Sequence, residues 1–248
     1  MNSELSKTRL NRYALLRHKK YREKEGLFMV QGEKSVKDTL NNFEVDAILT
    51  LKDKYFDWLE VPDKVYKVSE ADLRRISTLE KSPDIVAIYR IPYSKHSLHL
   101  VTAETCLVLD GVQDPGNLGT IVRTAHWFGL RKIYCSKDTV DLYNPKVVLA
   151  SMGSIGKLDV VYCDLNDLFS INPTVPVYGL SLTGEDIFSF DSYIPGFILM
   201  GSEGHGISDV AKTFITKSLT IPPSEVNDHP ESLNVATAVA ITISQLLK

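Results

Sequence analysis

The first ninety residues alternate short apolar runs with polar stretches of helical spacing. A basic helix is predicted over residues 3–20. After it, the pattern predicts a strand leading into a helix, two more strands, a short helix and a closing strand, at residues 27–36, 45–50, 65–69, 70–77 and 84–90. Strands and helices in this order are typical of βα units. We therefore expect this part to form a three-layer α/β sandwich.

The second part of the chain has apolar runs that are continuous rather than alternating. They lie at residues 106–110, 132–135, 158–161, 177–180, 197–201 and 219–221, with helical patterns between several of them. Continuous apolar strands indicate a parallel sheet covered on both faces. The pattern thus predicts two α/β domains, residues 1–95 and 105–248, joined by a linker at 96–104. Ligands of open parallel sheets bind at the carboxyl ends of the strands.

The loop after the strand at 106–110 leads into a helix. Residues 114–116 (Asp-Pro-Gly) form a turn signal, and Asn117 is the expected N-cap. Gly129 stands where a helix C-cap belongs. The apolar face of this helix is expected at Leu118, Ile121, Val122, Ala125 and Phe128. Arg123 lies outside that face, so it is either a ligand-binding residue at the strand ends or an ordinary surface residue.

A glycine-rich loop follows the strand at 197–201. Its glycines are Gly201, Gly204 and Gly206, and glycine allows a backbone to approach a ligand closely. The loop lacks the Gly-Lys-Ser/Thr ending of a Walker A loop and the GxGxxG spacing of dinucleotide-binding loops. Glu203 is its unusual member, and we interpret it either as part of a site or as a cap or ion-pair residue.

A third loop follows the last strand and runs from Ile221 to Ser232. Ser232, Leu233 and Asn234 then open a long apolar helix, which Ser232 or Asn234 could cap. This helix, at residues 233–247, is apolar on several sides. We therefore expect it to be deeply buried or to form a subunit interface.

Composition and charge narrow the class of protein. The 248-residue chain has a net charge of -3, so binding of nucleic acid requires a local basic patch. The first 24 residues are a candidate, with eight Lys/Arg against two Glu, and a solvated helix face is the alternative. No apolar run follows these basic residues, so no secretory signal is expected. No run is long enough to span a membrane.

The cysteines are few and widely spaced. Cys106, Cys135 and Cys163 are odd in number and have no CxxC spacing. This pattern indicates reduced, buried thiols in a cytoplasmic protein. We expect no metal site.

Taken together, the three loops resemble the signature motifs of the SpoU (TrmH-like) RNA ribose 2′-O-methyltransferases, in the SPOUT superfamily. The motifs are DPGNLGTIVR at 114–123, GSEGHG at 201–206, and a third motif made of Ile-Pro at 221–222 and Ser-Leu-Asn-Val at 232–235. NPKVVLASMGS at 144–154 and the segment at 20–36 are also similar to family segments. The resemblance covers nearly the whole chain.

The resemblance implies an α/β, SPOUT-type parallel-sheet catalytic domain with a trefoil knot, preceded by a small α/β RNA-binding domain. It implies S-adenosylmethionine as cofactor, a homodimer, and methyl transfer to a ribose 2′-hydroxyl of RNA, with ribosomal RNA the first choice and transfer RNA the second. The catalytic residues that it implies are Asn117, Arg123, Glu203, Ser232 and Asn234. The cofactor-binding residues that it implies are Gly201, Ile221 and Leu233.

The third motif departs from the family pattern. Pro223 stands where methionine is usual, and the loop at 222–231 is longer and lacks a glycine. The alternative function is therefore a non-catalytic RNA-binding or ribosome-assembly protein that keeps the fold. The enzyme is favoured by the retention of Asn117, Arg123, Glu203 and Asn234. A nucleotide-dependent enzyme unrelated to RNA is disfavoured by the missing phosphate-binding loops.

Overall fold

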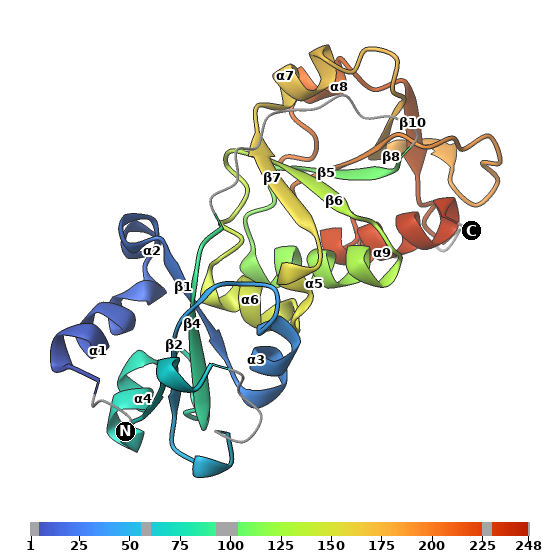
Figure 1. Ribbon diagram of the computed structural model, residues 1–248. Helices are drawn as coiled ribbons and strands as arrows, with labels where there is room; N and C mark the ends of the chain where they lie inside the picture. Colours follow the sequence, from blue (N-terminus) through green and yellow to red (C-terminus); the bar gives the residue numbers. More distant parts are fainter. Residues whose placement is uncertain (1–4, 56–60, 93–103, 225–229, 248) are drawn as a thin grey trace. The chain divides into compact units, whose positions relative to one another are not determined.

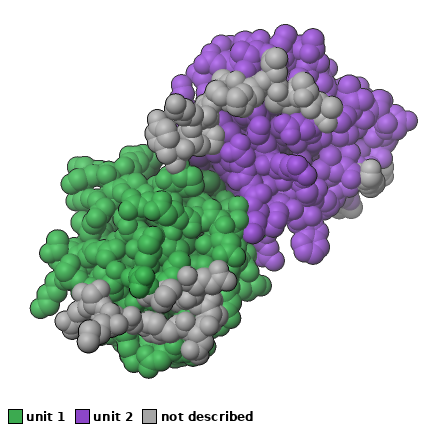
Figure 2. Space-filling view, in the orientation of Figure 1, with its two compact units in different colours: residues 1–94, 141–156 green, residues 95–140, 157–248 purple. Residues whose placement is uncertain are grey.

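The computed structural model describes residues 5–55, 61–92, 104–224 and 230–247. The chain forms two compact units, coloured separately in Figure 2: residues 1–94 with 141–156, and residues 95–140 with 157–248. The segment 141–156 thus follows a strand of the second unit in sequence but belongs to the first unit. Most of the predicted linker at 96–104 lies outside the described residues.

The first unit is built on a four-stranded mixed sheet (Figure 1). Its elements are α1 (Lys7–Ala14), η1 (Leu15–Arg17), α2 (Lys19–Glu25), β1 (Leu27–Gln31), α3 (Glu33–Thr39), β2 (Val45–Thr50), η2 (Asp53–Tyr55), η3 (Pro62–Lys64), β3 (Val65–Lys67), α4 (Glu70–Ile76), β4 (Ile85–Arg90), α6 (Pro145–Ala150) and η4 (Ser154–Gly156). The strand order is β1-β4-β2-β3. β4 is antiparallel to β1 and β2, whereas β3 is parallel to β2.

Both faces of this sheet are covered. Successive residues of β1 point to opposite faces, so their neighbours show what covers each one. Leu27 and Met29 join a core that includes residues of α1 and α4. Phe28 lies on the other face, with its ring centre 4.9 Å from that of Phe43 and 4.6 Å from that of Tyr143. Helix α3 packs against β1 and β4. The first unit is therefore the three-layer sandwich that the sequence pattern predicts.

The predicted basic helix at residues 3–20 is wrong in its extent. Within the described residues, α1 and α2 are separate helices, because His18 takes an extended conformation (φ −101°, ψ 133°) between them. Four of the eight basic residues before residue 25 form ion pairs: Arg9 with Asp46, Arg12 with Glu25, Lys19 with Glu23, and Arg22 with Asp141. The segment therefore presents fewer free cations than its composition indicates.

Arg22 is the buried member of this basic group, with 2% of its surface exposed. Its Nη1 donates to the carbonyl oxygen of Leu16 at 2.8 Å, and its Nε donates to Oδ2 of Asp141 at 3.0 Å. Asp141 begins the segment 141–156, whose helix α6 packs against β1. The ion pair therefore anchors this segment within the first unit.

The second unit is built on a six-stranded sheet in which every pair of neighbours is parallel. Its elements are β5 (Cys106–Asp110), α5 (Pro115–Trp127), β6 (Lys132–Ser136), β7 (Asp159–Cys163), α7 (Leu165–Ser170), β8 (Val177–Asp186), β9 (Phe197–Gly201), α8 (Asp209–Lys212), β10 (Lys217–Thr220) and α9 (Val235–Leu246). Figure 1 shows α5 and α9 side by side on one face, with α7 and α8 on the other. The predicted parallel sheet is confirmed.

The strand order of this sheet is β10-β8-β9-β5-β6-β7. From β5 the chain continues to β6 and β7 on one side, and later places β9, β8 and β10 on the other. The boundary between β5 and β9 is therefore the point where the winding direction reverses, which is where ligands bind in open α/β sheets. The trefoil knot stays a prediction, because strand order alone does not define how the chain threads.

We expect Arg22→Ala to lower the free energy of unfolding by about 3 kcal/mol. The reason is that Asp141, whose side chain is 19% exposed, would keep its charge without its partner. Urea denaturation followed by circular dichroism measures the change. Lys19→Ala breaks the exposed Lys19–Glu23 pair and is the matched control, with an expected change below about 0.5 kcal/mol. Equal losses for the two variants would contradict an anchoring role for Arg22.

Candidate functional site

Three polar residues from distant parts of the second unit meet in one hydrogen-bonded line. Asn234 precedes α9, Asn117 lies in the first turn of α5, and Glu203 follows β9. Nδ2 of Asn234 donates to Oδ1 of Asn117 at 2.9 Å, and Nδ2 of Asn117 donates to Oε1 of Glu203. We call Asn234, Asn117 and Glu203 the amide relay. It brings together one residue from each of the three sequence motifs.

The backbone of α9 sets the direction of the amide relay. Oδ1 of Asn234 accepts from the N–H groups of Ala236 at 3.0 Å and Thr237 at 3.3 Å, so Asn234 is the N-cap of α9. With its oxygen committed to the helix, Asn234 presents its NH₂ group to Asn117. Asn117 in turn presents its own NH₂ group to Glu203. The line therefore requires an acceptor at its end, and an ionised carboxylate is one.

The start of α5 differs from the sequence-based expectation. Asp114 is the N-cap, because its Oδ1 accepts from the backbone N–H of Asn117 at 2.8 Å. The prediction of Asn117 as the cap is wrong, since Pro115 fits the first helical position, where no N–H is needed. The earlier cap leaves the side chain of Asn117 available for the amide relay. Gly129 follows α5 with φ +77°, which confirms the predicted glycine stop.

The loop after β9 folds back on itself. The N–H of Ser202 donates to the carbonyl of Gly206 at 3.1 Å, and the N–H of Gly206 donates to the carbonyl of Ser202 at 2.9 Å. A Cβ on Gly201 would lie 2.1 Å from the carbonyl carbon of Gly206, so no side chain fits there. Gly201 therefore permits the tight return of the loop that carries Glu203.

Two of the predicted catalytic residues stand apart from the amide relay. Arg123 lies six residues after Asn117, which on a helix is about 9 Å along the axis and about 120° around it. Its side chain is exposed, and no hydrogen bond or ion pair joins it to another described residue. Ser232 is also exposed and also lacks such a partner in the part of the chain that the structure describes.

Two of the three predicted cofactor residues lie at strand ends, on either side of β8. Gly201 ends β9, and the half-buried Ile221 follows β10. Leu233 adjoins Asn234 of the amide relay and is 48% exposed. Apolar side chains left partly open at a polar edge fit a ligand with an apolar part, such as the adenosyl group of S-adenosylmethionine. Half of the atypical loop, residues 225–229, lies outside the described residues.

The sequence pattern did not predict a bulge in β8. The pairing of β8 with β10 skips residues 180–184, which leave the sheet as a bulge. Leu182 in this bulge is 72% exposed. Because β8 lies between β9 and β10, the bulge lies between the strand ends that carry Gly201 and Ile221. The bulge is therefore next to two of the three predicted cofactor residues.

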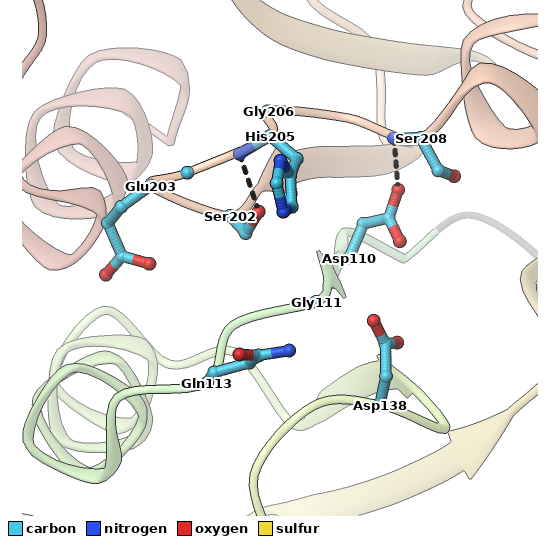
Figure 3. A pocket seen from close by; sticks show the side chains of 10 residues that line it. Asp110, Gly111, Gln113, Asp138, Ser202, Glu203, His205, Gly206 and Ser208 are labelled. Carbon is cyan, nitrogen blue, oxygen red and sulfur yellow. Dashed lines mark hydrogen bonds between the residues drawn. The ribbon is translucent and has the colours of Figure 1, made fainter.

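A cavity of about 280 Å³ adjoins Glu203 in the second unit (Figure 3). It lies between the loops that follow β5, β6 and β9. Its lining residues are Asp110, Gly111, Gln113, Asp138, Ser202, Glu203, Gly204, His205, Gly206 and Ser208. Of the predicted catalytic and cofactor residues, Glu203 alone lines it.

The three cysteines are buried, as the sequence predicts. Burial raises the pKa of Cys106 to about 12 and that of Cys163 to about 11, and it also raises the pKa of Cys135. Such thiols stay protonated at neutral pH and do not act as nucleophiles. Among the described residues, no group of three or more His, Cys, Asp or Glu is arranged to hold a metal. No helix in the described ranges has the length and apolar character needed to cross a membrane.

Two family models match the chain. The model of the SpoU rRNA Methylase family matches residues 104–244, which include the whole amide relay. The model of the MRM3-like substrate binding domain matches residues 7–87. The first match alone covers more than half of the chain.

Individual relatives match over nearly the full length. The chain is 30% identical over 239 residues to the 23S rRNA (guanosine(2553)-2′-O)-methyltransferase RlmP of Bacillus subtilis (strain 168), covering 93% of this chain and 92% of that protein. A TrmH-family protein from Porphyromonas gingivalis superposes with a TM-score of 0.88 at 34% identity and covers 98% of both chains. An AdoMet-bound rRNA methyltransferase from Sinorhizobium meliloti superposes with a TM-score of 0.85 at 28% identity, covering 99% of this chain and 96% of that one. These matches confirm the resemblance carried by the three motifs: this chain belongs to the SpoU rRNA methylase family.

Proposed function

We propose that this chain transfers a methyl group from S-adenosylmethionine to a ribose 2′-hydroxyl of ribosomal RNA. The observation that carries the proposal is the amide relay, which joins one residue of each family motif at one edge of the parallel sheet. The full-length similarity to an enzyme named for ribose methylation of ribosomal RNA supports this substrate over transfer RNA. The full-length similarity to a bacterial enzyme supports a cytoplasmic location, because bacterial ribosomes are assembled there.

Gly201, Ile221 and Leu233, with the bulge at 180–184, are the residues that would hold the cofactor. When bound, S-adenosylmethionine supplies a methyl group that its sulfonium charge has already activated. The chain then has two tasks, to hold the ribose oxygen in line with that methyl group and to help the hydroxyl lose its proton.

Arg123 and Glu203 have complementary charges for these tasks. A guanidinium stays protonated in proteins, so Arg123 is a poor base. It would instead bind an RNA phosphate or stabilise negative charge that develops on the ribose oxygen. Oε1 of Glu203 is held by Asn117, which leaves Oε2 to accept a hydrogen bond or the proton from the hydroxyl. Ser232, which is exposed and precedes Asn234 by two residues, would help to position the ribose.

The first unit is proposed to hold the RNA. Its match to a substrate-binding domain supports this role. Exposed basic side chains that form no ion pair with a described residue are available for phosphate contacts, and they include Lys7, Lys20, Lys24, Arg74 and Arg75. Recognition through shape and backbone is usual for structured RNA.

Exposed apolar side chains support a homodimer. Trp127 ends α5 and is 85% exposed. Phe128, which the sequence pattern places on the buried face, is 39% exposed because it lies beyond the last helical residue. α9 packs against α5, yet its Ile241 and the following Leu247 are only partly buried. A largely exposed Trp beside partly open apolar residues is typical of an interface anchor, so α5 and α9 form the proposed dimer face.

The proposed function is tested by cofactor binding and by removal of Arg123. Calorimetric titration should show saturable binding of S-adenosylmethionine and S-adenosylhomocysteine, but not of NAD. With unmodified ribosomal RNA, labelled methyl groups should appear in 2′-O-methylnucleosides. Arg123→Ala should slow transfer by about 10²- to 10³-fold, as loss of a charge-stabilising donor does, while cofactor affinity stays unchanged.

Arg131→Ala is the matched control, because Arg131 is exposed and lies outside the three motifs. Full activity of Arg123→Ala would remove the proposed role of this residue. Absence of both cofactor binding and transfer in the wild-type chain would instead favour the non-catalytic RNA-binding function.

Two substitutions at Asn234 separate its cap from its place in the amide relay. Asn234→Asp keeps a capping oxygen but loses the NH₂ group that donates a hydrogen bond to Oδ1 of Asn117. Its free energy of unfolding should stay within about 0.5 kcal/mol of wild type, while methyl transfer falls about tenfold or more. Asn234→Ala should lose the same activity and also about 1 kcal/mol of stability. Wild-type rates for Asn234→Asp would show that the amide relay does not serve the reaction.

Trp127→Ala tests the proposed dimer. The wild-type chain should sediment as a dimer, and the substitution should raise the dimer dissociation constant about 30-fold or more, as expected for an interface anchor. Val210→Ala is the control, because Val210 is 56% exposed on α8, on the opposite face of the sheet. A wild-type chain that sediments as a monomer at micromolar concentration would rule the dimer out.

A further inference from the structure

The cavity beside Glu203 lies at the reversal point of the sheet. The loops that enclose it follow β9, β5 and β6, and the boundary between β9 and β5 is where the winding direction changes. The cavity shares Glu203 with the amide relay, so a ligand inside it is adjacent to the proposed reaction centre. At about 280 Å³ it has room for one nucleoside rather than for an extended ligand.

A local hydrogen-bond network fixes one wall of this cavity. The N–H of Gly111 donates to Oγ of Ser136 at 2.8 Å, and Ser136 donates to Oδ1 of Asp138 at 2.6 Å. Gly111 has φ +73°, and a Cβ there would lie 3.1 Å from Oδ2 of Asp138. Glycine therefore lets the carboxylate of Asp138 approach the backbone. Oδ2 of Asp138 has no hydrogen-bond partner among the described residues.

The opposite wall is formed by the loop after β9. This loop is attached to the end of β5. There Asp110, which is 7% exposed, accepts through its Oδ2 a hydrogen bond from the N–H of Ser208 at 2.7 Å. The N–H of His205 donates to Oγ of Ser202 at 3.2 Å, which holds this part of the loop. Figure 3 shows the His205 ring and the side chains of Gln113 and Asp138 directed into the space between the loops.

The polar groups of the cavity select a ligand that donates hydrogen bonds. Three of the ten lining residues are carboxylates, and none of these described residues is Lys or Arg. Such a lining disfavours a phosphate and favours N–H donors. The imidazole of His205 offers a flat face on which a base can stack.

Guanine matches this lining better than the other bases. Its Watson–Crick edge carries two adjacent donors, N1–H and the N2 amino group, beside the O6 acceptor. A carboxylate accepts two parallel N–H bonds, as Asp138 would, and the amide of Gln113 can donate to O6. Adenine and cytosine place one amino donor beside a ring acceptor, whereas uracil places one donor between two acceptors.

We propose that this cavity receives the flipped base of the nucleotide to be methylated, and that Asp138 and Gln113 make guanine the preferred base. The inference rests on the proposed function. Enzymes that modify a base commonly take it out of the stack and recognise it in a pocket through its Watson–Crick edge, and the same arrangement is proposed here for an enzyme that acts on the ribose. The ribose of a base held here is then directed toward Glu203 and the amide relay.

The test uses the full chain, S-adenosylmethionine and unmodified ribosomal RNA transcripts, followed by mass spectrometry of the nucleosides. The wild-type product should be 2′-O-methylguanosine. Asp138→Asn should lower its rate of formation about 10- to 100-fold, the discrimination that one paired base contact provides. Calorimetry should show unchanged affinity for S-adenosylmethionine. Asp209→Asn is the matched control, because the side chain of Asp209 is 99% exposed and lies outside the cavity.

Transcripts in which inosine replaces guanosine provide a second arm, because inosine lacks only the N2 amino group. The replacement should slow the wild-type chain about tenfold and should have little further effect on Asp138→Asn, since the two changes remove the same contact. This coupling distinguishes base recognition from a merely structural role of Asp138.

The outcomes separate this inference from the proposed function. Formation of another 2′-O-methylnucleoside, or of 2′-O-methylguanosine at the wild-type rate by Asp138→Asn, overturns base recognition but leaves the methyltransferase function intact. Absence of any 2′-O-methylnucleoside with every ribosomal RNA overturns the proposed function, and the inference with it.

Discussion

The directional hydrogen bonds of the amide relay constrain the second unit at the edge where its chemistry lies. The N–H groups at the start of α9 hold the side-chain oxygen of Asn234, so its NH₂ group is directed at Asn117. That hydrogen bond orients Asn117, whose NH₂ group then donates to Glu203. The members are separated by 86 and 117 residues in sequence. No strand pairing joins the three positions directly, so their side chains link loops that the packing of α5 on α9 and the pairing of β5 with β9 bring close. Glu203 and Asn234 are exposed and Asn117 is half-buried, so these hydrogen bonds orient the side chains more than they stabilise the fold.

The amide relay depends in turn on the order of the strands. β5 and β9 are neighbours, and their register pairs Asp110 with Gly201. The two loops that follow therefore start at the same level, one leading to Asn117 and the other to Glu203. A rigid, apolar sheet thus positions polar loops without contributing polar side chains from its interior. The same neighbourhood creates the cavity, so the proposed base-binding and reacting groups share one scaffold.

The strands of both units could be predicted because their apolar pattern is local. Other features depended on partners that the local pattern does not name. Asn117 and Asp114 are both good N-cap residues, and the choice follows from Pro115, which suits the first helical position. Arg22 looked like one member of a basic patch, yet Asp141, 119 residues away, pairs with it in a buried position.

The functional residues show the same division between local and non-local information. Family motifs identified the members of the amide relay, but their hydrogen bonds required the tertiary structure. The bulge at 180–184 arises because β8 has more residues than β10 between two paired positions. The sequence of one strand alone does not reveal this difference. Asp138 belongs to no motif, and its relevance comes from the close approach of Gly111, from which α5 and β6 separate it in the chain. Arg123 is the opposite case to Asp138. It belongs to a clear motif, but its exposed side chain has no partner among the described residues.

Two glycines explain how both a cavity and a reacting loop fit at one pair of strand ends. Gly201 lies opposite Asp110 in the sheet, and Gly111 follows Asp110 directly. A Cβ at Gly201 would collide with the returning loop that carries Glu203, whereas a Cβ at Gly111 would press on Asp138 and approach Ser202 to 3.7 Å. The missing side chains let one loop turn tightly and keep the facing wall close without filling the space between them. The geometry that orients Glu203 and the room for a ligand beside it therefore have a common origin in these two positions.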